Sequence, residues 1–182
     1  MLAVGDLGII FGDDADLESA RKTVLDSALP VATRTAALQA IVERRPPDLR
    51  TMAAALLPVP SLNVPAAKAL ASFDDPAIGP QLVDAYRHFA VADRPQLIAA
   101  LSSRAMFAQS LFDAVAAGSI PASDLSPYIR RQIRLLGDAG LVQRLDALEK
   151  AGSDSRTAKE ALRAKYAEWL SPAALQAADV KH

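Results

Sequence analysis

The sequence contains no cysteine, and this absence excludes disulfide bonds, thiolate metal sites and cysteine nucleophiles. It has only two histidines, and one of them is the last residue. Two distant histidines without cysteine do not make a zinc or iron site. Aromatic residues make up only 5% of the chain, and no apolar run approaches the roughly 18 residues of a membrane span. We therefore expect neither a resident metal nor a membrane-spanning segment.

The chain also lacks a charge of one dominant sign, since its net charge is −1. Proteins that bind phosphate backbones or anionic membranes rely on long-range attraction, which this balance removes. We therefore expect no nucleic-acid partner. The first twelve residues are apolar, but they include Asp6 and have no basic stretch, so they are a poor signal peptide. They predict a helix over residues 2–11, a turn over 11–16 and a second helix over 17–28.

Hydrophobic residues are plentiful, at 51% of the chain, and much of this content is alanine and leucine. Alanine costs little side-chain entropy in a helix and lets neighbouring helices approach closely. With 182 residues, one domain of this size buries about 70% of its unfolded surface. The composition therefore predicts an all-α protein built from thin, closely spaced helices.

Residues 33–57 form the unit on which the chain is built. Apolar residues recur at helical spacing up to Arg44, and Pro46 and Pro47 then stop the helix because proline has no N–H to donate. Asp48 is a suitable N-cap for a second helix over residues 49–57. Two short helices with a tight break predict an αα-hairpin. One hairpin alone cannot bury its apolar face, so we expect several to stack.

The later sequence repeats this pattern of short helices separated by proline, glycine or aspartate. The ends of the first helix of each pair, Ile41, Leu70, Leu101 and Leu136, lie 29, 31 and 35 residues apart. These intervals fall below the ~40–47 residues of HEAT repeats and near the ~33–34 of other helical repeats. They predict a right-handed α-α superhelix, which is a HEAT-like or armadillo-like solenoid of about five short hairpins. The remaining helices are expected over residues 65–73, 78–86, 94–101, 104–117, 127–136 and 140–151.

The last part of the sequence has a different character. Residues 152–155 resemble a linker, a charged helix follows over 156–170, and Pro172 opens a short helix to residue 178. We therefore divide the chain into a solenoid over residues 1–152 and a C-terminal cap or connector over 153–182. Trp169 is in phase with Leu162 and Tyr166, which predicts that it packs in the core.

The densest basic cluster contains Arg130, Arg131 and Arg134 close to Tyr128. These four residues are the candidate partner-binding site, because arginines dock acidic groups and a tyrosine ring can stack. The alternative is a solvated helix face near the negative end of the helix dipole, where cations are favoured. His88 is expected at the surface or as a cap. The sequence has no nucleophile elbow, P-loop or dinucleotide fingerprint, so we expect no enzyme activity.

Several stretches together resemble a known protein segment. Among them are Ile10-Phe11-Gly12-Asp13, Arg94-Pro95, Ser103-Arg104, Gly118-Ser119-Ile120-Pro121, Arg131-Gln132-Ile133, Leu136-Gly137-Asp138 and the tail from Leu170 to His182. Their order resembles the HEAT-like segment of the large multidomain c-type haem proteins of planctomycetes and related bacteria. In that family the segment often follows a propeller-like, dehydrogenase-like domain and directly precedes a small cytochrome c domain.

The resemblance implies a scaffold that spaces or docks an electron-transfer domain in an exported, periplasmic or extracytoplasmic protein. Its partners would be another protein or neighbouring domains of the same polypeptide. The chain contains no Cys-x-x-Cys-His, so haem is expected only in a separate downstream domain and no cofactor in this chain.

Two alternatives remain open at this point. The first is a free-standing helical-repeat domain that binds a protein on its concave surface. The second is a helical-repeat enzyme of the DNA-glycosylase type, with Trp169 and the Arg130 cluster in a groove. The near-neutral charge disfavours the second alternative.

Overall fold

The protein is described by a computed structural model, which gives the backbone of residues 4–169 and the side chains of residues 15–167. This part of the chain is helical and contains no strand, which confirms the all-α prediction. The helices are α1 (Val4–Leu25), α2 (Val31–Arg44), α3 (Leu49–Leu56), α4 (Asn63–Leu70), α5 (Ile78–Ala85), η1 (Tyr86–His88), α6 (Arg94–Leu101), α7 (Ala105–Ala116), η2 (Ala122–Asp124), α8 (Pro127–Leu135) and α9 (Ala139–Trp169).

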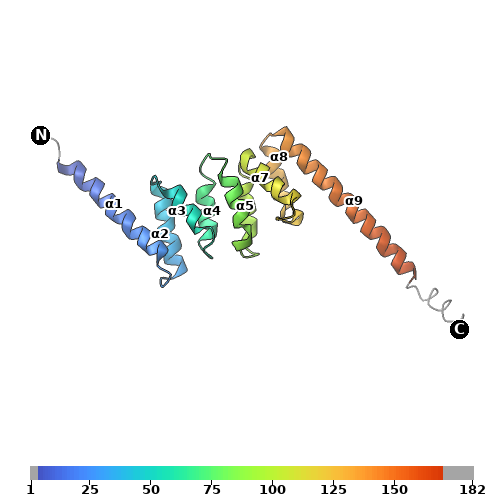
Figure 1. Ribbon diagram of the computed structural model, residues 1–182, viewed down its shortest axis with the longest axis horizontal. Coiled ribbons are helices and arrows are strands. Elements are labelled where there is room, and N and C mark those ends of the chain that lie inside the picture. Colours follow the sequence, from blue (N-terminus) through green and yellow to red (C-terminus); the bar gives the residue numbers. More distant parts are fainter. Residues whose placement is uncertain (1–3, 170–182) are drawn as a thin grey trace. The chain divides into compact units, whose positions relative to one another are not determined.

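The chain divides into two compact units, one ending at Gly137 and one beginning at Asp138. Within the first unit, α2 to α5 and α7 stand side by side (Figure 1). Contacts between successive helices join α1 to α2, α3 to α4, α5 to α6 and α6 to α7. Contacts between alternate helices join α2 to α4, α4 to α6 and α5 to α7. The principal contacts of α1 to α7 are therefore with helices that are next or next but one along the chain.

The two helices predicted over residues 33–57 are present as α2 and α3, but their expected pairing is wrong. The most extensive contact of α2 is with α1, and that of α3 is with α4. Val24 of α1 is fully buried, and its carbonyl accepts a 2.9 Å hydrogen bond from Arg34 Nε of α2. After α2, Arg45 takes a left-handed conformation with φ 50°, and the prolines that follow carry the chain away. The proline break therefore separates two pairs and does not form the turn of one.

The core of the first unit is aliphatic, as its composition predicts. Its largest fully buried side chains are Phe107, Leu38, Ile41, Leu49, Leu62, Leu70, Ile78, Leu82, Leu97, Ile98, Leu101 and Leu111. A close approach of two helices lies at Gly79, where an added Cβ would come within 2.5 Å of Ser110 Oγ. The absence of a side chain at Gly79 therefore lets α5 lie directly against α7.

Glycine and serine residues mark several helix ends, as their known preferences at these positions predict. Gly118 and Gly137 have φ of 76° and 73°, as expected of residues that follow a helix C-terminus. Ser126 caps α8, because its hydroxyl oxygen accepts a 3.3 Å hydrogen bond from Ile129 N–H. Asp48 stands at the N-cap position of α3 but makes no side-chain cap bond, contrary to the prediction, and Asp93 at the N-cap position of α6 makes none either.

The Asp48 carboxylate has a different partner. Its Oδ1 accepts a 2.7 Å hydrogen bond from Arg21 Nη2 of α1, and Arg21 Nη1 also binds Glu18 at 2.7 Å. These two carboxylates raise the pKa of the Arg21 guanidinium, with the hydrogen bond that Arg21 donates to Asp48 as the larger cause. Asp48 therefore joins α1 to the start of α3, a contact that the local sequence does not reveal.

Three further predictions, which concern the two longest helices, are wrong. α1 continues through residues 11–16, where a turn was expected, and α9 continues through 152–155, where a break was expected. Glycine costs about 1 kcal/mol in a helix interior but does not stop a helix as proline does. Leu162 and Tyr166 are each 52% exposed, so the stripe expected to pack is on the surface. The Trp169 side chain and residues 172–178 lie outside the described residues.

No helix in the described part of the chain combines the length and the apolar character that a bilayer crossing requires.

Candidate binding groove

Two hollows of the first unit share a wall on α6. One has a volume of about 470 Å³ and the other about 400 Å³, and both are lined by Gln96 and Ala99. We call the two hollows together the binding groove. The larger is further lined by Val91, Arg94, Pro95, Ser123, Asp124, Ser126, Tyr128 and Ile129. The smaller is further lined by Lys68, Ala71 and Ala100.

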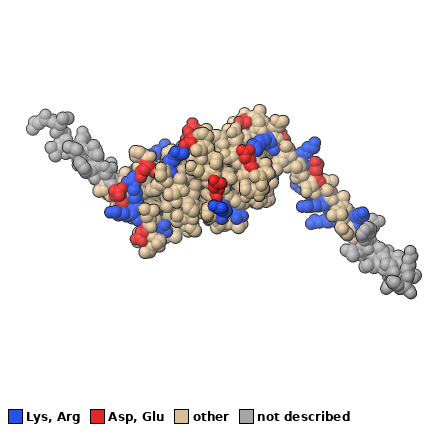
Figure 2. Space-filling view, viewed as in Figure 1, with Lys and Arg blue, Asp and Glu red and all other residues tan. Residues whose placement is uncertain are grey.

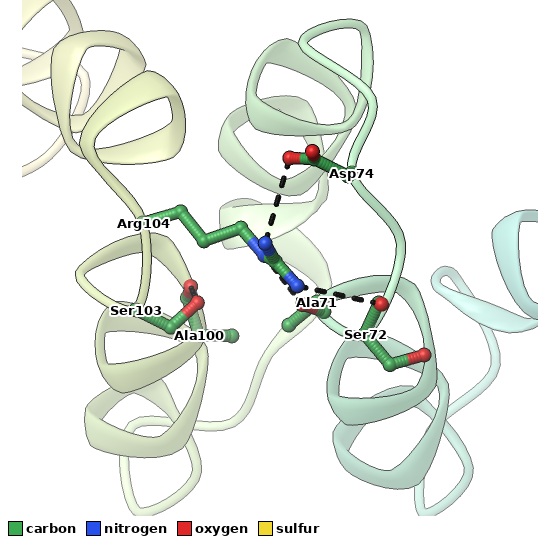
Figure 3. Close-up of polar contacts among 6 residues, drawn as sticks. All are labelled: Ala71, Ser72, Asp74, Ala100, Ser103 and Arg104. Atoms are coloured by element: carbon green, nitrogen blue, oxygen red, sulfur yellow. Dashed lines mark hydrogen bonds and ion pairs between the residues drawn. The ribbon is translucent and has the colours of Figure 1, made fainter.

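Arg104 holds the walls of the smaller hollow together. It follows α6 and reaches back to the C-terminal end of α4, where its Nε donates to Ala71 O at 3.3 Å (Figure 3). Its Nη2 lies 3.5 Å from Ser72 O, and its Nη1 lies 3.4 Å from Asp74 Oδ1. Ala71 and Ala100 face the hollow from the two helices that Arg104 connects. The guanidinium therefore satisfies carbonyls left open at the end of α4 and links this end to the start of α7.

A buried tyrosine supports the larger hollow. Tyr86 is only 7% exposed, and its hydroxyl donates a 2.5 Å hydrogen bond to Asp124 Oδ2 of η2. The Arg94 guanidinium lies over the Tyr86 ring, with its carbon 4.6 Å from the ring centre. Burial, and then the hydrogen bond to the Asp124 carboxylate, raise the pKa of Tyr86 above its ordinary value of 10.0. Tyr86 therefore fixes both charged residues that line this hollow.

The rim of the larger hollow is apolar and exposed. Val91 is 75% exposed and Tyr128 is 70% exposed, and both are among the few large hydrophobic side chains at the described surface. Figure 2 shows that charged side chains of the compact part gather in small mixed groups, with broad uncharged areas between them. Exposed apolar side chains beside a hollow are typical of interaction sites rather than of plain surface.

The structure separates the four residues predicted to bind a partner. Tyr128 lines the groove, whereas Arg130, Arg131 and Arg134 do not. Arg130 is partly buried and its Nε donates a 2.8 Å hydrogen bond to Leu125 O, so it holds the entry to α8. Arg131 and Arg134 are exposed on α8. Because residues three apart are neighbours on a helix, Arg131 lies beside Tyr128 on α8, although it lines neither hollow.

His88 lies at the surface, on the wall of a separate hollow of about 260 Å³ together with Asp84 and Arg87. Its Nε2 accepts a hydrogen bond from Arg87 Nε at 3.3 Å, and its carbonyl accepts one from the buried Asn63 side chain at 3.2 Å. Among the described side chains, no three of His, Asp or Glu gather to hold a metal ion.

Sequence reasoning missed Lys68, Arg94, Gln96 and Arg104 as members of one site. They come from α4, α6 and the segment after α6, and no local pattern links them. The groove offers amide, hydroxyl, cationic and apolar contacts, and its one carboxylate, Asp124, already accepts the Tyr86 hydrogen bond. Such a lining is suited to holding a ligand. Comparison of the chain with known protein families, with curated proteins and with solved structures finds no match.

Proposed function

We propose that the first unit is a short HEAT-like α-solenoid. The support is its pattern of contacts, in which α2, α4 and α6 contact one another in turn while α5 contacts α7. Successive helices connect these two rows. A fold in which each element packs only on near neighbours along the chain is the defining property of helical-repeat proteins.

We further propose that this unit is a non-catalytic scaffold that binds another protein segment in its groove. The observation that carries this proposal is that the two hollows share the lining residues Gln96 and Ala99, and that the larger one is bordered by the exposed Val91 and Tyr128. Helical-repeat proteins use extended grooves of this kind as binding surfaces. The small Ala99 side chain leaves room for a peptide backbone to approach the helix.

Selection from a displayed random peptide library tests this proposal on the full chain. Binders should lose affinity for Ala99→Gln, which extends a neutral side chain into both hollows, and for Tyr128→Ala, which removes an exposed contact without touching the core. Ala158→Gln is the matched control, because Ala158 is exposed on α9 and lines neither hollow. Circular dichroism shows that each variant is folded. Binders that are indifferent to both groove variants would refute the proposal.

From the sequence resemblance, we also propose that this scaffold spaces or docks a c-type haem domain within a larger exported protein. The chain has no cysteine for covalent haem attachment, so the haem would belong to a separate downstream domain. An in-frame Cys-x-x-Cys-His after His182 in the gene would support this context. A Soret band from the purified 182-residue chain would refute the assignment of the haem to another domain.

A further inference from the structure

The charges along the groove define the ligand more narrowly than the proposed function does. Three charged residues line it, namely Lys68, Arg94 and Asp124. Asp124 accepts hydrogen bonds from the Tyr86 hydroxyl at 2.5 Å and from Ser123 at 3.4 Å, which occupy acceptor positions on both of its oxygens without removing its charge. With two cations against this one carboxylate, the lining of the groove has a net charge of about +1.

The two cations lie in different hollows. Lys68 is exposed and has no ion-pair partner among the described side chains. Arg94 lines the larger hollow, is partly exposed, and has its guanidinium held over the Tyr86 ring. Its Nε is buried and out of a ligand's reach, so a ligand carboxylate would bind its terminal nitrogens, where charge-assisted hydrogen bonds are strong.

Between the cations, Gln96 lines both hollows and its side chain is exposed. A primary amide carries both donors and an acceptor, so it can pair with a peptide group of a chain that crosses the groove. The apolar rim at Val91 and Tyr128 adds a place for a large hydrophobic side chain beside Arg94. Arg131, next to Tyr128 on α8, adds a third cation at that end.

We infer that the groove binds an extended acidic peptide that places a hydrophobic side chain between Val91 and Tyr128 and carboxylates at Arg94 and Lys68. This inference rests on the proposed function and adds to it the chemistry of the partner. Surface cations on a near-neutral protein give this specificity locally, without a large positive field that would attract any polyanion.

The test uses a short fluorescein-labelled peptide with one phenylalanine flanked by glutamates in a glycine–serine background. Fluorescence anisotropy with the full chain should give saturable binding that weakens as salt rises. Replacing every glutamate by glutamine, or the phenylalanine by alanine, should each weaken binding about tenfold or more.

Reversal of one charge on the protein tests directly whether the groove prefers acidic peptides. Lys68→Glu should weaken binding of the glutamate peptide about tenfold and should favour the same peptide with lysine in place of glutamate. Lys159→Glu on α9 is the matched control, because it makes the same charge change at an exposed lysine that lines neither hollow, and it should change affinity by less than about twofold.

Different experimental results would contradict this inference and the proposed function. If the glutamine peptide binds as tightly as the glutamate peptide, and Tyr128→Ala still abolishes binding, the groove holds peptides but has no preference for acidic ones, and the inference is overturned. A single-stranded oligonucleotide that displaces the peptide at lower concentration, or self-association that closes the groove, would also overturn it. If no peptide binds in a way that depends on Ala99 or Tyr128, the proposed function itself is wrong.

Discussion

Arg104 offers the most direct test of how the groove is held. Replacement by alanine removes one hydrogen bond to Ala71 O in a partly buried position and two longer contacts at 3.4 and 3.5 Å. The first is worth about 1 kcal/mol, because it is charge-assisted but long. The other two add about 0.5 kcal/mol, because Asp74 is 74% exposed and water screens the pair. Arg104→Ala should therefore destabilise the protein by about 1.5 kcal/mol.

Urea unfolding followed by circular dichroism measures this change, and the slope of the transition should remain that of the parent protein. For a chain of this length the loss corresponds to a fall in Tm of about 3–6 °C. Arg104→Lys should recover only part of the loss, since one ammonium group lacks the fork that reaches three acceptors. Arg131→Ala is the control. It removes an exposed arginine from α8 and should change stability by less than about 0.5 kcal/mol.

A double-mutant cycle with Asp74→Ala separates the carbonyl contacts from the ion pair. The coupling between Arg104 and Asp74 should be below about 0.5 kcal/mol. If Asp74→Ala were as damaging as Arg104→Ala, the ion pair would hold the helices together and the reasoning from the Ala71 and Ser72 carbonyls would be wrong. The same would follow if Arg104→Ala left stability unchanged.

Three further changes test other parts of the fold. Tyr86→Phe should cost about 1 kcal/mol at pH 8. Folding raises the pKa of Tyr86 above 10.0, so its hydroxyl contributes fully to the stability below pH 10, and this contribution is lost as the pH rises through the pKa of the folded state. The difference in urea midpoint between the parent protein and Tyr86→Phe should therefore shrink by pH 11. Ser126→Ala should cost about 1 kcal/mol in urea unfolding by removing the cap of α8, and Ser126→Asp should retain most of the stability. Gly79→Ala should lower the thermal midpoint through a cost of about 1–3 kcal/mol. Adding Ser110→Ala should recover part of this loss, because it removes the Oγ at 2.5 Å and leaves the Cβ at 3.1 Å.

The sequence predicts the helices of the first unit well where the signal is local. Proline at 46 and 47 and glycine at 118 and 137 act on the backbone of their own segment, and the structure ends helices at each of these places. Glycine at 12 and 152 is a weaker signal, because it lowers helix stability without removing a hydrogen bond, and both positions lie within helices.

The local sequence does not predict which helices pair or which residues line the groove. The sequence spacing of α2 and α3 fits a hairpin as well as it fits two neighbouring pairs, and long-range contacts such as Arg21 to Asp48 decide between them. In the same way, the basic neighbours of Tyr128 in the sequence predict a site on α8, whereas the structure shows that Tyr128 lines one hollow together with Arg94 and Val91. The residues that line the groove come from helices about thirty residues apart, so the sequence of any one helix shows no pattern that predicts the groove.

The arrangement of contacts also bears on how the chain is made. Since α4 packs on α2, α3 and α6, and α5 on α6 and α7, these helices find their partners shortly before or after they leave the ribosome. Closing such short loops costs little entropy, so none of the helices from α2 to α7 depends on a distant segment for its principal contacts. The growing polypeptide can therefore bury its leucines layer by layer during synthesis.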